Sequence, residues 1–227
     1  AAEILATIQA QITPRTRLIA ISHVSWLDGA ILPVRELTGH GVPVLVDGAQ
    51  GAGAIPVAVE ELRADYYTVS GQKWLMGPAA TGALYVGADR LNDCRVAFPS
   101  YFSWKLPDYE FRVGAARFEG SWIPAASVAG LLASLAFAAE VGEERFNSAR
   151  EAAERCRTLL LEHGADVVTE PDQATLVSWR AAEPEVLVNR LAEQGVVVRE
   201  LPGAGLLRAS CGYWTSEHDL QRLIREL

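Results

Sequence analysis

Four short apolar runs in the first ninety residues constrain what this chain can fold into. Each run is rich in Val, Ile, Leu or Tyr, and together they cover residues 18–24, 42–47, 66–70 and 82–87. Stretches with helical character separate the first three runs, at residues 31–40 and 58–64. Continuously apolar strands are typical of a parallel sheet with helices on both faces. The first part of the chain is therefore predicted to be α/β, with a mostly parallel sheet.

A different order of elements is predicted in the second part. A helix starts at Pro124, breaks near Gly142 and continues to about His163. Beyond it we expect a strand, a helix, two strands and a closing helix, at residues 174–181, 183–195, 196–201, 205–210 and 215–227. This order is typical of a small α+β domain. We therefore predict two units, residues 1–140 and residues 141–227, the second including its connecting helix.

Charge and cysteine content exclude several classes of partner. The chain has 28 acidic and 20 basic residues and a formal net charge of -8, whereas nucleic-acid binding needs a basic face. No apolar run reaches the ~18–20 residues of a membrane span. The three cysteines, Cys94, Cys156 and Cys211, lack the spacing of a disulfide framework or a metal site. We expect a cytoplasmic protein that binds neither nucleic acid nor membrane.

Polar residues stand where two of the predicted strands end. Asp47 ends one strand, and ligands bind at the carboxyl ends of strands in open α/β sheets. An aspartate here can also simply cap the next turn. Lys73 follows the next strand in a bend of small residues. Its amine either reaches water, as most lysine amines do, or is desolvated and able to form a Schiff base.

Two arginines in the second unit interrupt or end apolar strands. Arg199 and Arg208 stand in "VVVRELPGAGLLRAS", and an arginine fork suits bidentate capture of a carboxylate. For Arg199, a place on an edge strand is an equally good explanation. Taken together, the lysine, the aspartate, a hydroxyl at Ser70 and an arginine fit a pyridoxal phosphate (PLP) site. Asp47 and Ser70 end successive strands 70 − 47 = 23 positions apart.

The segments that carry these residues resemble a known family. They are "HVSW" (23–26), "VPVLVDGAQGAGAIPV" (42–57), "DYYTVSGQKWLMGPAATGALYV" (65–86), "RFEG" (117–120) and "LLRASCGYWTSEHDL" (206–220). They are similar to class V, fold-type I PLP-dependent enzymes, which include cysteine desulfurases, isopenicillin N epimerase-like proteins and cysteine C–S lyases. The resemblance is closest to the L-cysteine/cystine C–S lyase branch. It implies that residues 1–140 are the C-terminal portion of the large PLP-binding domain.

The resemblance assigns cofactor contacts to five residues. Asp47 would pair with the pyridine nitrogen, and Gln50 would bond the ring hydroxyl oxygen. Ser70 would bind the phosphate, near Gln72, which stands where relatives commonly carry His. Lys73 would hold PLP as a Schiff base and later move protons.

The resemblance also implies a substrate and a reaction. Arg208 would bind the substrate carboxylate, with Arg199 nearby, and His23 would support the site. The implied reaction is β-elimination from cysteine, cystine or an S-substituted cysteine, free or tethered to a carrier, yielding thiol or persulfide, pyruvate and ammonia. The aromatic residues of segment 98–111 would line the pocket for the sulfur substituent or pack at the interface of a homodimer.

Other functions remain open at this point. An aminotransferase, an epimerase or a cysteine desulfurase would use the same cofactor, and a non-catalytic remnant would keep only the fold. Desulfurase chemistry is disfavoured because segment 196–208 lacks a cysteine to accept sulfur. Two departures from relatives are Trp26, where many have Asn, and Trp122, where a Thr reaches across the dimer to the phosphate. The phosphate-binding N-terminal part of the fold is missing, so we expect this chain alone to bind PLP poorly.

Overall fold

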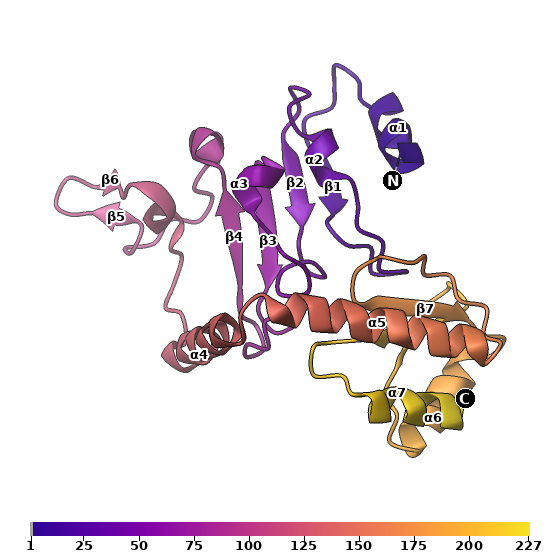
Figure 1. The fold of residues 1–227 in the computed structure, drawn as a ribbon. Coiled ribbons are helices and arrows are strands. Elements are labelled where there is room, and N and C mark those ends of the chain that lie inside the picture. Colours follow the sequence, from indigo (N-terminus) through magenta and orange to yellow (C-terminus); the bar gives the residue numbers. More distant parts are fainter. Residues whose placement is uncertain (1) are drawn as a thin grey trace.

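The computed structural model describes residues 2–227, and its first part contains a four-stranded sheet (Figure 1). The strands lie in the order β1-β2-β3-β4; the first three are parallel, and β4 is antiparallel to β3. The elements of this part are α1 (Ala2–Ala10), β1 (Ile19–Ser22), α2 (Val34–Leu37), β2 (Val44–Asp47), α3 (Val59–Leu62), β3 (Tyr66–Ser70) and β4 (Gly82–Val86). The mostly parallel α/β sheet expected from the four apolar runs is confirmed.

The two faces of this sheet differ in what covers them. One face carries Val44, Val46 and Tyr67, which are almost fully buried in a cluster with apolar side chains of α1, α2 and α3. Because successive side chains of a strand point to opposite faces, Leu45 and Leu84 lie on the other face. Leu84 is 60% exposed there. Within the described residues, helices α1–α3 therefore all pack on one side of the sheet.

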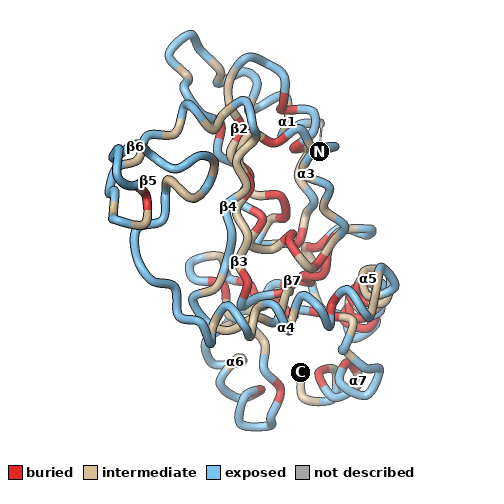
Figure 2. The backbone as a smooth tube through the Cα atoms, turned by 90° about the vertical axis from the view of Figure 1, so that its left-hand side faces the viewer, coloured by how far each residue is buried: buried red, intermediate tan, exposed pale blue. Residues whose placement is uncertain are grey.

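The middle of the chain leaves the sheet and returns to it. After β4 come η1 (Ala88–Asp93), the short hairpin β5 (Trp104–Lys105) and β6 (Glu110–Phe111), and η2 (Gly114–Phe118). This region projects past β4, away from the other elements (Figure 1). Two long helices follow, α4 (Ala125–Val141) and α5 (Glu144–Glu162). Figure 2 shows that α4 is mostly exposed, with Ala138 as its buried residue.

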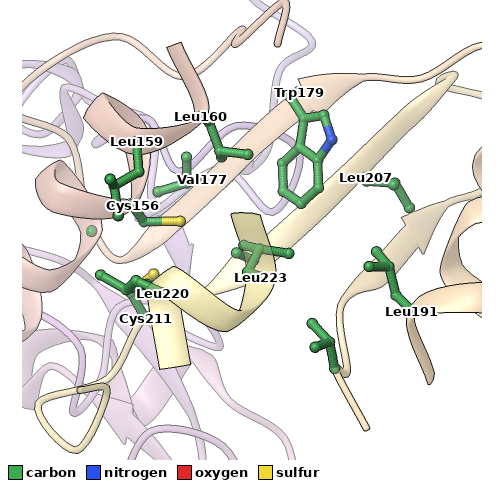
Figure 3. Packing of buried hydrophobic residues seen from close by; sticks show 13 residues of the cluster. Cys156, Leu159, Leu160, Val177, Trp179, Leu191, Leu207, Cys211, Leu220 and Leu223 are labelled. Atoms are coloured by element: carbon green, nitrogen blue, oxygen red, sulfur yellow. The ribbon is translucent and has the colours of Figure 1, made fainter. Parts of the chain in front are cut away.

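The second part is an α+β unit around a three-stranded antiparallel sheet. Its strands lie in the order β7-β9-β8, and its elements are β7 (Leu176–Arg180), α6 (Pro184–Glu193), β8 (Arg199–Leu201), β9 (Leu206–Ser210) and α7 (Glu217–Glu226). Side chains from α5, α6, α7, β7 and β9 form one buried cluster (Figure 3). A capping box begins α7, because Ser216 and Asp219 bond each other's backbone N–H.

Backbone contacts join the two parts. In the loop after β1, the carbonyl of Gly29 accepts a hydrogen bond from the N–H of Ala174 at 3.0 Å. The N–H of Ile31 donates to Oε1 of Gln173 at 2.9 Å. Gly29 has φ +77°, and a Cβ there would collide with the carbonyl of Leu176. Only glycine therefore lets this loop approach β7 so closely.

Several predicted boundaries change in the structure. The strand expected at 196–201 begins at Arg199, because pairing with β9 starts at that residue. Val197, before this pairing, is exposed. Within the aromatic segment 98–111, for which no strand was predicted, the structure contains the β5–β6 hairpin. The helix break lies at Gly142 as predicted. The boundary between the two units at residue 140 stays a prediction.

No single described helix is long and apolar enough to cross a membrane. Helices α4 and α5 meet that criterion only when they are taken together, and they are bent by 84° at their break. Residues 2–227 also contain no group of three His, Cys, Asp or Glu side chains that could hold a metal ion.

Candidate active site

The candidate site lies at the carboxyl ends of the parallel strands. Ser22, Asp47 and Thr68 stand side by side in the register of β1, β2 and β3. Parallel strands end at the same edge of a sheet, so the turns that follow them converge there. The turns carry Gln50 and Lys73, which sequence reasoning placed in the same site.

Asp47 is held by two hydrogen bonds. Its Oδ1 accepts from the backbone N–H of Ala49 at 2.9 Å and from Oγ1 of Thr68 at 3.2 Å. The carboxylate is exposed, and both of these bonds reach the same oxygen. Asp47 therefore caps the turn, which is one of the two roles that the sequence left open for it. Its second carboxylate oxygen remains available to a ligand.

Trp74, the residue after Lys73 in the sequence, connects the Lys73 turn to Gln50. The indole Nε1 of Trp74 donates to Oε1 of Gln50 at 2.9 Å. This bond fixes the amide so that its NH₂ group is the end left to donate. A ring hydroxyl oxygen needs such a donor. Trp74 itself is buried, whereas Lys73 beside it is exposed.

The described residues leave Lys73 open to solvent, which is the first of the two alternatives that the sequence left open for its amine. The turn around it is nevertheless well defined: the N–H of Met76 donates to the carbonyl of Lys73 at 2.9 Å, and that of Gly77 to Gly71 at 2.7 Å. Ser70 is half-buried at the end of β3, and Gln72 is exposed beside the lysine.

A buried pair lies behind the aspartate. Nδ1 of His23 and the hydroxyl of Tyr67 are 2.9 Å apart, and the two rings meet edge to face. Burial lowers the pKa of His23. Burial, and secondly the charge of Asp47, raise the pKa of Tyr67. Burial therefore favours the neutral form of His23, and Tyr67 is a partner that sequence reasoning missed.

Arg208 reaches the site from the α+β unit formed by α5–α7 and β7–β9, which we call the small domain. Its Nη1 donates to the carbonyl of Trp26 at 2.7 Å, and its Nε is buried without a hydrogen-bond partner among the described residues. Arg199 stands directly opposite it in the β8–β9 register, but is exposed. Burial, and secondly the charge of Arg199, lower the pKa of Arg208. A buried, partly unpaired guanidinium favours an anionic ligand such as a carboxylate.

The aromatic segment 98–111 is not brought to this site. It lies beyond β4, on the projecting region of the chain, and Phe98 is 88% exposed (Figure 1). Phe102 packs on Tyr101 and Trp122, and Trp104 stacks on Phe111. The prediction that these rings line a substrate pocket is therefore not met within this chain.

The residues at the strand ends fit a pyridine ring with polar substituents. Asp47 offers a free carboxylate oxygen, the fixed amide of Gln50 offers donors, Ser70 offers a hydroxyl, and Lys73 offers an amine. The unpartnered Nε of Arg208 is an additional donor for an anion. Trp74 and Thr68 were missed by sequence reasoning, although Thr68 was detectable as the residue two positions before Ser70 on the same face of β3.

Comparisons with known proteins agree with this arrangement. The family model described as Aminotransferase class-V matches residues 3–223. The isopenicillin N epimerase of Streptomyces clavuligerus is 32% identical over 98% of this chain and 62% of its own length. The solved complex of the cystine C-S lyase C-DES with its reaction product cysteine persulfide superposes with a TM-score of 0.92 and 31% identity, over 98% of this chain and 63% of that one.

A second C-DES structure bears on the cofactor. A lysine-to-alanine mutant with glycine covalently linked to its PLP cofactor superposes with a TM-score of 0.89 and 30% identity, over 97% of this chain and 62% of that one. The present chain therefore spans about three-fifths of the length of these relatives.

Proposed function

The chain belongs to the class-V aminotransferase family, and we propose that it forms part of a PLP-dependent carbon–sulfur lyase. The reaction would be β-elimination from cysteine, cystine or an S-substituted cysteine. The observation that carries the proposal is the convergence of Asp47, Gln50 and Lys73 at one sheet edge, with the buried Arg208 arriving from the small domain. The likeness to a cystine C–S lyase over almost the whole chain supports it.

The chain's residues would hold the cofactor at four points. The free oxygen of Asp47 would face the pyridine nitrogen, and the amide of Gln50 would donate to the ring oxygen. Ser70 and Gln72 would contribute to phosphate binding, and the amine of Lys73 would hold PLP covalently. When bound, PLP supplies an electron sink for the substrate's Cα.

The same residues would orient the substrate and move its proton. Arg208 would bind the substrate carboxylate, with Arg199 adding positive charge from the neighbouring strand. Lys73 would take the proton from Cα, while the carboxylate of Asp47 keeps the ring nitrogen protonated. The sulfur substituent then leaves Cβ as thiolate or persulfide, and hydrolysis of the remaining fragment gives pyruvate and ammonia.

Sulfur transfer to an enzyme cysteine is the less favoured alternative. The turn between β8 and β9, near the candidate substrate arginines, contains no cysteine. Cys211, the next one along the chain, is almost fully buried, and its hydrogen bond to Cys156, followed by burial, raises the pKa of its thiol. A nucleophilic cysteine needs access and a thiolate. An epimerase or aminotransferase is distinguished by its products.

The rest of the assembly is also a proposal. We propose a cytoplasmic homodimer whose two units divide at residue 140, and whose substrate is a free or carrier-tethered amino acid. All three cysteines are free, which agrees with a reducing compartment. The donors described here do not surround a phosphate, so we propose that further polypeptide completes the site and that this chain alone binds PLP weakly.

The proposal is tested on the full-length protein with PLP. Lys73 is one of only two lysines in these 227 residues, the other being Lys105 on β5. Borohydride should reduce a visible absorbance band and leave the cofactor attached to Lys73 in peptide mapping. Lys73→Ala should abolish the absorbance band and lower the rate of pyruvate release by at least about 1,000-fold. Lys105→Arg should keep both the band and the rate. Reduction at Lys105, or no band at all, would contradict the proposal.

Product analysis then separates the reactions. Pyruvate and sulfide or persulfide from cysteine or cystine support the lyase. Racemisation without pyruvate, or a requirement for a keto acid, supports the epimerase or the aminotransferase.

A further inference from the structure

The segment after β9 crosses from the small domain to the turn that carries Lys73. Trp214 packs on Trp74, with ring centroids 6.2 Å apart and planes tilted by 33°. The hydroxyl of Tyr213 lies 3.8 Å from the sulfur of Met76. Tyr213 and Trp214 also pack edge to face, at 4.9 Å. Both residues therefore contact the turn that follows Lys73.

The backbone of the Lys73 turn needs such support. Met76 has φ +55°, a left-handed conformation that residues with a side chain seldom adopt. Conformations of this kind persist only where surrounding contacts hold them. Met76 is the only methionine of the chain, and its sulfur meets the hydroxyl of Tyr213.

The crossing segment is itself locally fixed. The N–H of Gly212 donates to Oγ1 of Thr215 at 3.0 Å, and the N–H of Thr215 donates back to the carbonyl of Gly212 at 2.9 Å. A Cβ at Gly212 would collide with the ring of Trp214. The absence of a side chain at Gly212 therefore lets the indole fold back over the bend and reach Trp74.

These contacts attach the small domain to a second turn of the sheet domain, in addition to the bonds that it makes with the loop after β1. One of those bonds joins Nη1 of Arg208 to the carbonyl of Trp26, which ties β9 to the loop. The crossing segment starts four residues beyond Arg208, at Gly212, and reaches the turn after β3. The bonds to the loop after β1 do not touch the turn that carries Lys73. The contacts of Tyr213 and Trp214 therefore tie the small domain to this turn as well.

We propose that Tyr213 and Trp214 are positioning residues that set the Lys73 turn relative to Arg208. This inference rests on the proposed function, in which Arg208 holds the substrate and Lys73 moves its proton. Trp214 acts through Trp74, whose indole Nε1 also donates a hydrogen bond to Oε1 of Gln50 at 2.9 Å. Loss of the indole would leave substrate binding intact and misalign the proton transfer.

The test uses four variants of the full-length protein. Trp214→Ala removes the ring, Trp214→Phe restores an aromatic ring, Gly212→Ala displaces the indole, and Tyr213→Phe removes the contact with sulfur. Leu161→Ala, an exposed apolar truncation at the end of α5, is the matched control. Aromatic contacts of this kind change equilibria by about two- to tenfold.

The first measurement needs neither cofactor nor activity. Amide hydrogen exchange of the peptide covering residues 70–78 should become about two- to tenfold faster in Trp214→Ala and Gly212→Ala. Exchange of the peptide covering residues 199–207 should stay unchanged. An equal increase in both peptides would show general destabilisation and overturn the inference, as would no increase at residues 70–78.

The second measurement separates positioning from binding. In Trp214→Ala, kcat should fall about three- to tenfold while KM changes less than about twofold, and Trp214→Phe should recover most of the loss. A rise in KM at unchanged kcat would overturn the inference. Absence of cofactor on Lys73 in the wild-type protein would instead defeat the proposed function, and the exchange experiment would still decide whether Trp214 holds the turn.

Discussion

The small domain and the four-stranded sheet bury their apolar residues to very different extents. In the small domain, Leu160, Leu191 and Leu207 are completely buried, in a cluster to which every helix of the domain contributes (Figure 3). The sheet is closed on one face by α1–α3, whereas Leu84 on the other face is 60% exposed. Leu132 on α4 is 61% exposed.

The difference concerns packing partners rather than composition. Helix α4 is apolar nearly all round, and such a helix is normally buried on all sides. Here it presents Leu132, Leu135 and Phe137 to solvent. The chain spans about three-fifths of its relatives' length. The small domain thus buries its own core, while α4 and one face of the sheet stay exposed among the described residues.

Truncating one leucine in each region gives the largest expected contrast. Leu207→Ala removes a fully buried side chain, so it should cost about 2–5 kcal/mol of unfolding free energy both in this chain and in the full-length protein. Leu132→Ala should cost less than about 0.5 kcal/mol in this chain. Urea unfolding of both variants, followed by circular dichroism, measures the two costs.

The full-length protein sharpens this comparison. If further protein covers α4, Leu132→Ala should cost about 2 kcal/mol or more there. A cost that stays near zero in the full-length protein would show that α4 is exposed in the complete molecule too. Val186→Ala on the exposed face of α6 is the matched control, with little cost in either form.

A smaller effect is expected from the buried pair behind Asp47. Tyr67→Phe keeps the ring but removes the hydroxyl that lies 2.9 Å from Nδ1 of His23. A buried imidazole nitrogen then loses its partner, which costs about 1–3 kcal/mol. Tyr85→Phe, one strand away on β4, should cost less, because Tyr85 is only half-buried. Equal costs for the two variants would show that the hydroxyl–imidazole bond contributes nothing specific.

The sequence predicted the elements that depend on local pattern. Strands β2 and β3 end at Asp47 and Ser70 as the apolar runs indicated, and the Ser216 capping box follows from two residues three positions apart. Position at a strand end also put Asp47 and Lys73 at the ends of neighbouring parallel strands, β2 and β3. Local pattern failed for Val197, which was predicted to lie in a strand and is instead exposed before β8.

Contacts between distant residues had no signal in the sequence. His23 meets Tyr67 across 44 positions, and Arg208 meets the carbonyl of Trp26 across 182. A backbone carbonyl has no residue type to recognise, so the second contact is invisible in any single sequence. The sequence left the exposure of Lys73 open for a related reason: desolvation depends on which surfaces surround a side chain, and strand order alone does not give them.

The smallest expected effect is a difference in acid sensitivity between the two regions. Burial lowers the pKa of His23 below its ordinary value of 6.5. The unfolded chain therefore binds more protons than the folded one as pH falls below about 6.5, and the sheet loses stability there. In the small domain, the hydrogen bond from Arg155 lowers the pKa of Glu217 from 4.5 to about 2. That contribution is present above pH 4.5 and is lost as pH falls toward 2.

Between pH 6.5 and 5, acid should therefore loosen the sheet before it affects the contact between α5 and α7. Native-state hydrogen exchange, corrected for intrinsic rates, should show lower protection in peptides from β1–β3 and unchanged protection in peptides from α5 and α7. His23→Gln should remove the pH dependence in the sheet, and His218→Gln, on exposed α7, should not. If both regions lose protection together, or if His23→Gln keeps the full pH dependence, buried His23 is not the group that makes the sheet the more acid-sensitive region.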